Sequence, residues 1–358
     1  MNTPDLVGAA GLVRECKKGI FLPDRLWQLT LKDCYPPFVH YWTHSATYRG
    51  QVKLACSGAS SSMQNLSQGQ LLSFDFLYMP VAEHRAIAAF LDQETGKIDA
   101  LVAEQERLMA LLKEKRQAVI SHAVTKGLDA NAPMKRSGVE WLGDVPAHWE
   151  VRRVKTVSTF ITSGPRGWSD RVGEEGSLFI QSGDLDDALE VDFAGAKRVQ
   201  TNGDAEAPRT QLYNGDVVVC ITGAKTGNVA LCAVVPEAAY INQHLCLIRP
   251  ANNILPKFLG ILLKSKLGQN HFEISQYGLK QGLSLEDVRD APVFLPPIAE
   301  QLAIVSYLHA QTSKLDTLNS EAERAITLLK ERRAALISAA VTGKIDVRGL
   351  VPGVQEAA

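Results

Sequence analysis

The sequence predicts an α+β protein. Two mixed, β-rich domains, the first of them truncated, are joined by two long antiparallel coiled-coil helices with pseudo-twofold symmetry. Three observations lead to this prediction: a helical segment that occurs twice, a strand-rich stretch between the two occurrences, and a much shorter stretch before the first one. They divide the chain into a partial first domain (1–80), a first helical region (81–130), a second domain (131–294), a second helical region (295–346) and a tail (347–358).

The helical segment is duplicated without a gap. A shift of 217 positions lays residues 82–129 on residues 299–346, and about half of the positions are identical. The same shift continues more weakly upstream, where it matches Gln64 with Gln281, Leu66 with Leu283, and Ser67 with Ser284. The duplicated unit therefore includes the end of whatever precedes each helix.

Each copy reads as a short helix, a break and a long helix. Thr95-Gly96-Lys97 and Thr312-Ser313-Lys314 supply the predicted breaks, with Thr95 and Thr312 as N-caps of the long helices. Apolar residues at spacings of three and four then predict a coiled-coil seam formed by Ile98, Leu101, Leu108, Leu112, Val119, Leu315, Leu318, Leu329 and Leu336. The alternative is two unrelated amphipathic helices, each packed on its own domain. Two matching sequences at one shift favour a mutual pairing about a pseudo-twofold axis.

Interruptions of the seam and the length of the helices add two expectations. Gln105 and Ala322 break the apolar pattern at one level, and Lys115 and Arg332 break it at another. Polar residues in a seam can fix register and partner. A helix over residues 95–123 spans about 40 Å at about 1.5 Å per residue. That length is close to one turn of B-DNA, about 34–36 Å, and predicts that the helices act as a spacer.

The stretch between the copies has the composition of a β-rich domain. From about residue 135 to 292, strand-like runs at 178–181, 216–222, 229–235 and 244–249 alternate with Gly, Asn and Asp turns. A helical run at 256–267 and a loop at 276–282 follow. We expect a mixed, mostly β domain of about 150 residues.

Two loops of this domain carry residue types that suit DNA. In the first loop, glycines would let the backbone approach phosphates while lysine and threonine offer donors; in the second, amide side chains could read adenine edges beside a cation. The candidates are Thr222, Gly223, Lys225, Thr226, Gln243, Gln276, Lys280 and Gln281. A solvated hairpin is the alternative for the first loop, and bracing of the sheet is the alternative for Gln243. With 38 basic and 39 acidic residues, DNA binding must rest on local patches or on partners, because DNA-binding proteins usually carry a basic surplus.

Several classes of function are excluded by missing motifs. The six cysteines form no C-x-x-C pair and the eight histidines lack ligand spacing, so no metal site is expected. No apolar run reaches the length of a membrane span and the N-terminus does not resemble a signal peptide, which predicts a cytoplasmic protein without membrane contact. Nucleotide-binding, hydrolase and amino-methyltransferase motifs are absent, so no catalytic residue is predicted. Binding and assembly remain as the classes of function that the sequence allows.

Four phrases of the sequence now narrow the class of protein. They are SGVEWLGDVPAHWEVRRVK (137–155), INQHLCLIRP (241–250), LPPIAEQ (295–301) and LISAAVTGKIDVR (336–348). In the sequences of these segments and in their order, the chain resembles the specificity subunits of Type I restriction-modification systems. The resemblance covers nearly everything from about Asp24 onward.

The resemblance implies a non-catalytic subunit with two target-recognition domains, each reading one half of a split site in double-stranded DNA. It also implies that two modification (methyltransferase) subunits dock on the helices and that a restriction (translocase and nuclease) subunit completes the complex. S-adenosylmethionine, ATP and Mg would then be bound by those partners, and no cofactor by this chain. Candidate docking residues are Glu104, Arg107, Arg116, Glu321, Arg324 and Arg333; a solvated helix face is the alternative.

The first domain departs from this pattern. It has about 80 residues before its helix, whereas the second domain has about 150, so the counterpart of the loop at 222–227 is missing. A truncated product, a part encoded elsewhere and a structural cap are three open explanations. We expect the second domain to do most of the reading. The rival hypotheses are a scaffold remnant that binds partner subunits without reading DNA, and an enzyme of unseen type.

Overall fold

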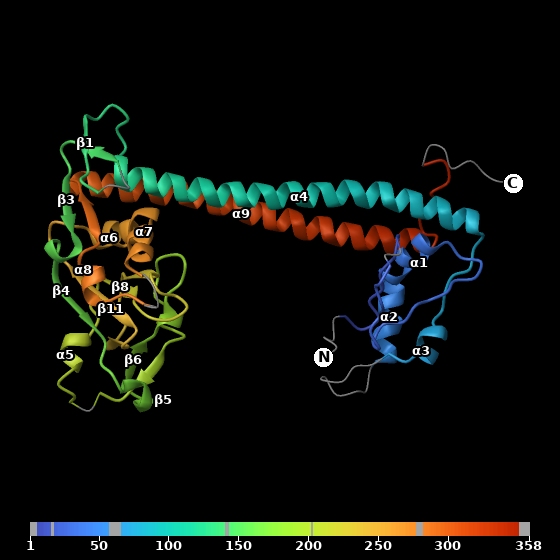
Figure 1. The fold of residues 1–358 in the computed structure, drawn as a ribbon, viewed down its shortest axis with the longest axis horizontal. Coiled ribbons are helices and arrows are strands. Elements are labelled where there is room, and N and C mark those ends of the chain that lie inside the picture. Colours follow the sequence, from blue (N-terminus) through green and yellow to red (C-terminus); the bar gives the residue numbers. More distant parts are fainter. Residues whose placement is uncertain are drawn as a thin grey trace. The chain divides into compact units, whose positions relative to one another are not determined.

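The computed structural model (Figure 1) describes residues 6–15, 18–56, 66–139, 143–201, 203–276 and 282–350. The chain forms two compact units. Unit 1 consists of residues 1–110 and 318–358, and unit 2 of residues 111–317. The two longest helices, α4 (Val81–Lys126) and α9 (Ile298–Val341), each contribute one part to either unit.

The described residues of unit 1 form helices and irregular segments but no strand. Besides its parts of α4 and α9 it holds α1 (Pro36–Thr43), α2 (Ala46–Ala55) and α3 (Gln68–Leu72). Serine side chains begin two of these helices: Ser45 Oγ accepts the Tyr48 N–H, and Ser67 forms a capping box with Gln70. Aromatic residues of α1 and α2 pack with Leu91 of α4 and Ile337 of α9 to form one core.

Unit 2 contains all twelve strands that the described part of the chain forms. Its main sheet has the order β4-β11-β8-β9, and a second sheet has the order β10-β6-β7-β5. Two small sheets pair β1 with β2 and β12 with β3. The strands are β1 (Met134–Arg136), β2 (Asp144–Pro146), β3 (Glu150–Arg153), β4 (Ser158–Ser163), β5 (Val172–Gly173), β6 (Ser177–Ile180), β7 (Lys197–Val199), β8 (Asp216–Cys220), β9 (Val229–Cys232), β10 (Ala239–Ile241), β11 (Leu245–Pro250) and β12 (Pro292–Leu295).

The main sheet lies between two apolar layers. β8, with the sequence DVVVC, is buried along its whole length, as β-branched residues in a central strand favour. Val217 and Val219 point into the same core as α6 (Pro256–Lys264) and α7 (Lys266–Ser275), while Val218 and Cys220 point into the core shared with the second sheet. The alternation of side chains along a strand thus produces a layer of helices, the main sheet and the second sheet. Two shorter helices, α5 (Ala207–Thr210) and α8 (Leu285–Arg289), complete unit 2 with 3-10 turns at Val154–Thr156, Trp168–Arg171 and Ser182–Asp184.

The helices α4 and α9 are continuous, and the predicted breaks are wrong. Both helices run through the Thr95-Gly96-Lys97 and Thr312-Ser313-Lys314 segments. Instead of capping a new helix, the Thr95 hydroxyl donates to the carbonyl of Leu91, four residues earlier in the same helix. The single Gly96 costs only about 1 kcal/mol in a helix, less than tertiary packing supplies.

The seam between the helices differs from the predicted one by one residue in places. Ile98, Leu112 and Leu315 are buried and Val119, Leu329 and Leu336 are half-buried, but Leu101, Leu108 and Leu318 are 52%, 40% and 46% exposed. The inward positions of α4 alternate by four and three residues: 91, 95, 98, 102, 105, 109, 112, 116, 119 and 123. A shift of 217 turns this series into the inward positions of α9 from Leu308 to Ala340. Gln105 and Ala322 are therefore members of the seam, and the leucines beside them face outward.

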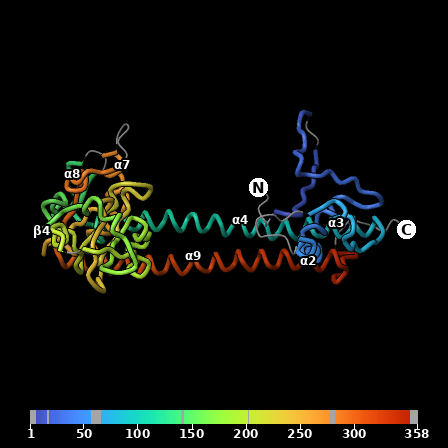
Figure 2. Tube along the Cα trace, turned by 90° about the horizontal axis from the view of Figure 1, so that it is seen from below, coloured from blue at the N-terminus to red at the C-terminus, as the bar shows by residue number. Residues whose placement is uncertain are grey.

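Two ion pairs connect α4 with α9, which run side by side in opposite directions within each unit (Figures 1 and 2). In unit 1, Arg333 Nε donates to Asp99 Oδ1 at 2.8 Å. In unit 2, Arg116 bonds to Asp316. The shift of 217 turns Asp99 into Asp316 and Arg116 into Arg333, so one pair is the repeat equivalent of the other. Arg116 and Arg333, which we predicted to dock partners, thus bind the neighbouring helix instead.

The repeat extends further upstream in the structure than in the sequence. α3 and α8 are equivalent at the same shift, and both begin with a serine capping box, at Ser67 and Ser284. α1 and α2 match α6 and α7 at a shift of 220, with N-caps at Ser45 and Ser265. Unit 1 therefore contains the helical half of the fold that unit 2 completes with strands.

Candidate nucleic-acid interface

The loop between β8 and β9 is a tight, internally bonded turn. The N–H and the hydroxyl of Thr226 both donate to Gly223 O, at 3.0 and 2.7 Å, and the Gly227 N–H donates to Cys220 O at 2.7 Å. Gly223 and Gly227 have φ values of +103° and +90°, which glycine adopts without strain. Thr222 and Lys225 are exposed on this turn.

Lys225 has partners within unit 2. Its ammonium group donates to Gly183 O at 3.2 Å and to Leu185 O at 2.9 Å. Lys264 holds the same segment through Asp186 O at 3.0 Å, and burial lowers the pKa of Lys264. The charge of Lys225 is therefore placed at the surface by two carbonyl groups, which fix its direction without neutralising it.

The two predicted loops meet at one edge of the main sheet, where β4 and β8 end and β9 and β11 begin. The Leu283 N–H donates to Ile221 O at 2.8 Å, so the end of the second loop lies against the start of the first. A Cβ on Gly282, whose φ is +121°, would lie 2.9 Å from Ile221 O, and only glycine fits this approach. Lys280 and Gln281, which directly precede Gly282, lie outside the described residues.

Gln243 lies beside this edge, and Gln276 follows the last residue of α7. The Ile221 N–H donates to His244 O at 2.8 Å, which places Gln243 one residue from the first loop. The Gln243 amide lies 3.3 Å from His244 Nε2. Gln276 caps α7 by donating to Phe272 O at 3.2 Å. The structure thus brings Gln243 next to the first loop, and Gly227 of that loop packs on Phe272 of α7, four residues before Gln276.

Arg166 is a candidate that sequence reasoning missed. It follows β4, in a turn where a Cβ on Gly164 would lie 2.2 Å from Asn242 O, so the turn packs directly against the residue before Gln243. Arg166 is exposed and forms no ion pair with any residue that the structure describes. A cation between a proline and a glycine directly after a strand was the available signal.

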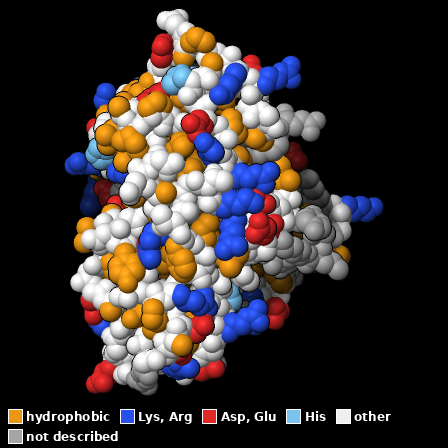
Figure 3. All heavy atoms as spheres, turned by 90° about the vertical axis from the view of Figure 1, so that its left-hand side faces the viewer, with side chains coloured by type: hydrophobic (Ala, Val, Ile, Leu, Met, Phe, Trp, Pro, Cys, Tyr) orange, Lys and Arg blue, Asp and Glu red, His pale blue; other side chains and the backbone are white. Residues whose placement is uncertain are grey.

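Several other basic side chains of unit 2 are paired with acids. Figure 3 shows Lys and Arg side chains gathered beside Asp and Glu side chains on the face that carries β3. Arg153 and Lys155 contact Asp290 at 2.9 and 2.8 Å, and Arg152 contacts Glu150 at 2.7 Å. This face is less suited to phosphates than the edge around Arg166, because its charges already have partners.

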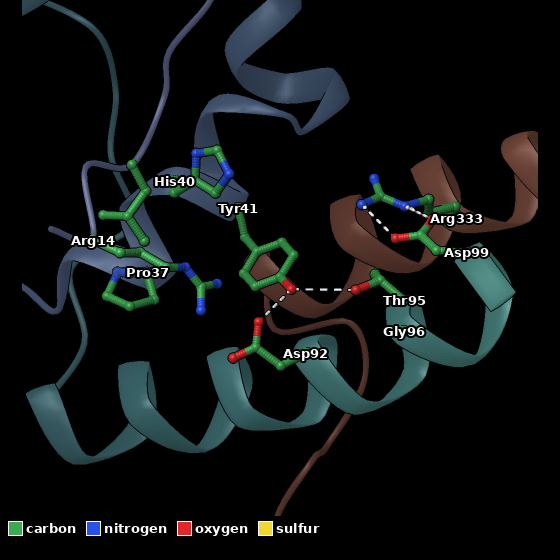
Figure 4. A pocket seen from close by; sticks show the side chains of 10 residues that line it. Arg14, Pro37, His40, Tyr41, Asp92, Thr95, Gly96, Asp99 and Arg333 are labelled. Carbon is green, nitrogen blue, oxygen red and sulfur yellow. Dashed lines mark hydrogen bonds and ion pairs between the residues drawn. The ribbon is translucent and has the colours of Figure 1, made fainter.

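Unit 1 contains a small polar cavity of ≈ 290 Å³ (Figure 4). The Tyr41 hydroxyl donates to Asp92 Oδ1 at 2.7 Å and lies 3.2 Å from Thr95 Oγ1. Burial raises the pKa of Tyr41 to about 12, and burial also lowers the pKa of His40. Tyr41, Asp92 and Thr95 satisfy one another, whereas His40 Nδ1 has no hydrogen-bond partner among the described residues. The cavity is at the lower limit of ligand pockets, so we assign it a structural role.

Neither a metal site nor a membrane span is found in the described part of the chain. No group of three or more His, Cys, Asp or Glu side chains there could hold a metal ion. None of the helices is both long and apolar enough to cross a bilayer.

The family model for the Type I restriction modification DNA specificity domain matches residues 147–328. These residues include every strand and helix of the interface described above. The chain belongs to this family. Membership of the Type I specificity family confirms the predicted class of protein: a chain that recognises DNA and leaves the chemistry to other subunits.

Curated relatives are distant but extend over most of the chain. The specificity subunit of the Type I restriction enzyme EcoKI from Escherichia coli strain K12 is 23% identical over 346 residues, which are 92% of this chain and 68% of the relative. The EcoBI specificity subunit from Escherichia coli is 25% identical over 301 residues, 81% of this chain and 62% of the relative. The Type I specificity chain thus spans about two thirds of the length of these relatives.

Solved structures confirm the α+β fold class. A chain from a study of complex assembly and conformational transition of the type I R-M system is matched with a TM-score of 0.69 at 19% identity, over 87% of this chain and 72% of that one. The HsdS subunit from Thermoanaerobacter tengcongensis is matched with a TM-score of 0.52 at 19% identity, over 87% and 70%.

Proposed function

We propose that this Type I specificity protein reads one half of a bipartite double-stranded DNA sequence with unit 2. The observation that carries this proposal is the convergence of the two loops and the Arg166 turn at one edge of the main sheet. Gln243, Gln276 and Gln281 would supply amide groups for base edges, and Arg166, Lys225 and Lys280 would supply cations for phosphates. Gly223 would let the backbone approach the phosphates, and Thr222 and Thr226 would lie beside it with hydroxyl groups.

The partner subunits would dock on α4 and α9. Leu101 and its repeat equivalent Leu318 are 52% and 46% exposed, and Leu111 and its equivalent Leu328 are 52% and 56% exposed. Each helix thus has the same outward apolar positions, flanked by the charged residues Glu104, Arg107, Glu321 and Arg324, all exposed. Two copies of one surface suit two copies of one partner, the modification subunit. A restriction subunit that binds ATP and Mg would complete a cytoplasmic complex. S-adenosylmethionine would be bound by the modification subunits.

The helices would also act as a spacer between the two DNA half-sites. α4 has 46 residues and α9 has 44. At about 1.5 Å per residue each is about 65–70 Å long, about twice the helical turn of B-DNA. The predicted spacer is therefore longer than the sequence analysis indicated, since the helices continue through the expected breaks.

A salt titration tests the DNA interface. Methylome sequencing of cells that express the chain with its modification subunit first identifies the target. In the purified complex, Arg166→Gln should then weaken binding about fivefold at 0.15 M salt and reduce the slope of log K against log salt by about 0.9, the effect of one phosphate contact. Arg198→Gln removes the same charge from an arginine that is paired with Glu237, and should leave the slope unchanged.

The result also separates the proposal from its rival. Equal slopes for the wild type and the Arg166→Gln variant would show that the turn after β4 does not contact phosphates. A methylome without any split motif would favour the scaffold remnant, which the absence of strands in the described residues of unit 1 keeps as the second candidate.

A further inference from the structure

Unit 1 exposes segments whose repeat equivalents are paired strands in unit 2. The shift of 220 that relates α1 to α6 also lays residues 25–30 on β11, the strand between β4 and β8. Leu26 and Trp27 are 55% and 39% exposed, whereas their equivalents Cys246 and Leu247 are fully buried. Residues 25–30 thus take the positions of a central strand, but they form no strand in the described part of unit 1.

A second segment shows the same contrast. The shift of 217 lays residues 75–78 on β12, which is buried along its length and pairs with β3. Leu77 and Tyr78 are 52% and 71% exposed, whereas their equivalents Phe294 and Leu295 are 0% and 9% exposed. Asp75 exchanges two hydrogen bonds with the Gln51 side chain, at 2.6 and 3.0 Å. No strand in the described part of unit 1 pairs with residues 76–78, so their backbone forms an open edge.

The end of the long helix repeats this difference. Both α4 and α9 are followed by a left-handed glycine, Gly127 with φ +74° and Gly343 with φ +71°. A Cβ on Gly127 would lie 3.2 Å from Trp149, the fully buried residue that precedes β3. A Cβ on Gly343 would meet no atom of the described residues within 4 Å. The position that Trp149 covers in unit 2 is thus open in unit 1.

We propose that residues 75–78 of unit 1 accept an antiparallel β-strand from a second polypeptide. The register of β12 with β3 defines the chemistry of that strand. Val151 lies opposite Phe294 and Arg153 lies opposite Pro292. The added strand would therefore place an apolar residue opposite Leu77 and a basic residue opposite Asp75, with an aromatic residue next to the open glycine.

A second copy of this chain does not fit the requirement, because the β3 strand of each copy is already paired with its own β12. The acid on the open edge supports the choice of a basic strand. Asp75 takes the place of Pro292, so a residue at the position of Arg153 would face a carboxylate in unit 1.

The test uses the full chain and a fluorescein-labelled peptide with the sequence of residues 147–157, AHWEVRRVKTV. Fluorescence anisotropy should show saturable binding. Leu77→Asp should weaken it about tenfold, because a leucine side chain is no longer buried and a charge is placed on the edge. Leu54→Asp is the matched control: Leu54 is 75% exposed and its equivalent Ile274 is 62% exposed, so no strand covers this position in either unit.

An exchange of charges tests the register. Asp75→Arg should weaken the peptide about threefold, the effect of one cross-strand charge pair, and replacing the arginine at position 153 of the peptide by glutamate should restore binding to this variant. Failure of the restoration would contradict the proposed register.

Hydrogen exchange makes the proposal falsifiable without relying on the peptide's affinity. In the chain alone, the amides of residues 76–78 should exchange much faster than those of residues 293–295, and the peptide should protect them. Protection in the chain alone would overturn the proposal, as would a self-associated chain that Leu77→Asp makes monomeric. The assays contain no DNA, so their failure is distinguishable from failure of the proposed reading function.

Discussion

The two glycines that follow the long helices provide a matched pair of substitutions. Gly343→Ala places a methyl group in open space, so its cost is the left-handed backbone alone, about 1 kcal/mol. Gly127→Ala has the same backbone cost, but its Cβ would also lie 3.1 Å from Glu300 Oε1 and 3.2 Å from Trp149. Trp149 is fully buried and cannot move aside. Overpacking of this kind adds about 1–3 kcal/mol, so we expect about 2–4 kcal/mol in total for Gly127→Ala.

Urea unfolding with probes for each unit measures both costs. Trp149 and Trp168 report on unit 2, Trp27 and Trp42 report on unit 1, and hydrogen exchange assigns the transitions. Gly127→Ala should shift the unit 2 transition and Gly343→Ala should shift the unit 1 transition by a smaller amount. Equal costs would refute the claim that Trp149 fills a position that is open in unit 1.

Three further predictions concern groups with defined partners. In a double-mutant cycle, Asp99→Ala and Arg333→Ala should couple by about 0.5 kcal/mol in urea unfolding, since both side chains are partly exposed; no coupling would mean that the pair adds no stability. Burial raises the pKa of Tyr41 to about 12, and the unfolded tyrosine ionises near pH 10. The wild type should therefore lose stability between pH 10 and 12 relative to Tyr41→Phe, as measured by unfolding at a series of pH values. Burial also raises the pKa of the Cys220, Cys232 and Cys246 thiols, so Ellman's reagent at pH 8 should modify the half-buried Cys34 of the folded chain and reach those three only after unfolding; their modification in the folded chain would show that the main sheet opens.

The sequence predicted individual strands better than it predicted which strands pair and which helix residues face each other. Runs at 178–181, 216–222 and 229–235 correspond to β6, β8 and β9, because patterns of β-branched residues act within a few positions. The pairing of β3 with β12 joins residues more than a hundred positions apart, and no local pattern indicates it. Leu101 and Leu108 were placed in the seam because leucine is the usual seam residue, whereas burial follows the strict alternation of four and three and puts Gln105 inside.

The sequence predicted the loops of the candidate site but not how they come together in three dimensions. The glycine-rich loop was visible as a turn, and the structure adds that Gly282 packs on Ile221 and that Gly164 packs on Asn242. These close approaches depend on backbone geometry in three dimensions. They explain why Arg166, which has no motif around it, joins the same edge as Gln243.

The reciprocal ion pairs have an evolutionary consequence. In a homodimer each chain would offer the same aspartate to the same arginine of its neighbour, and every interface contact would occur twice. Asp99 with Arg333 and Arg116 with Asp316 have that form within a single chain, as expected from the duplication and fusion of an ancestral gene for one half. Before fusion, any substitution in the seam would have changed both sides at once. Once the halves shared one chain, each could change alone. The seam positions occupied by Val102 in α4 and Asn319 in α9, like those of Gln105 and Ala322, record substitutions that only one half accepted.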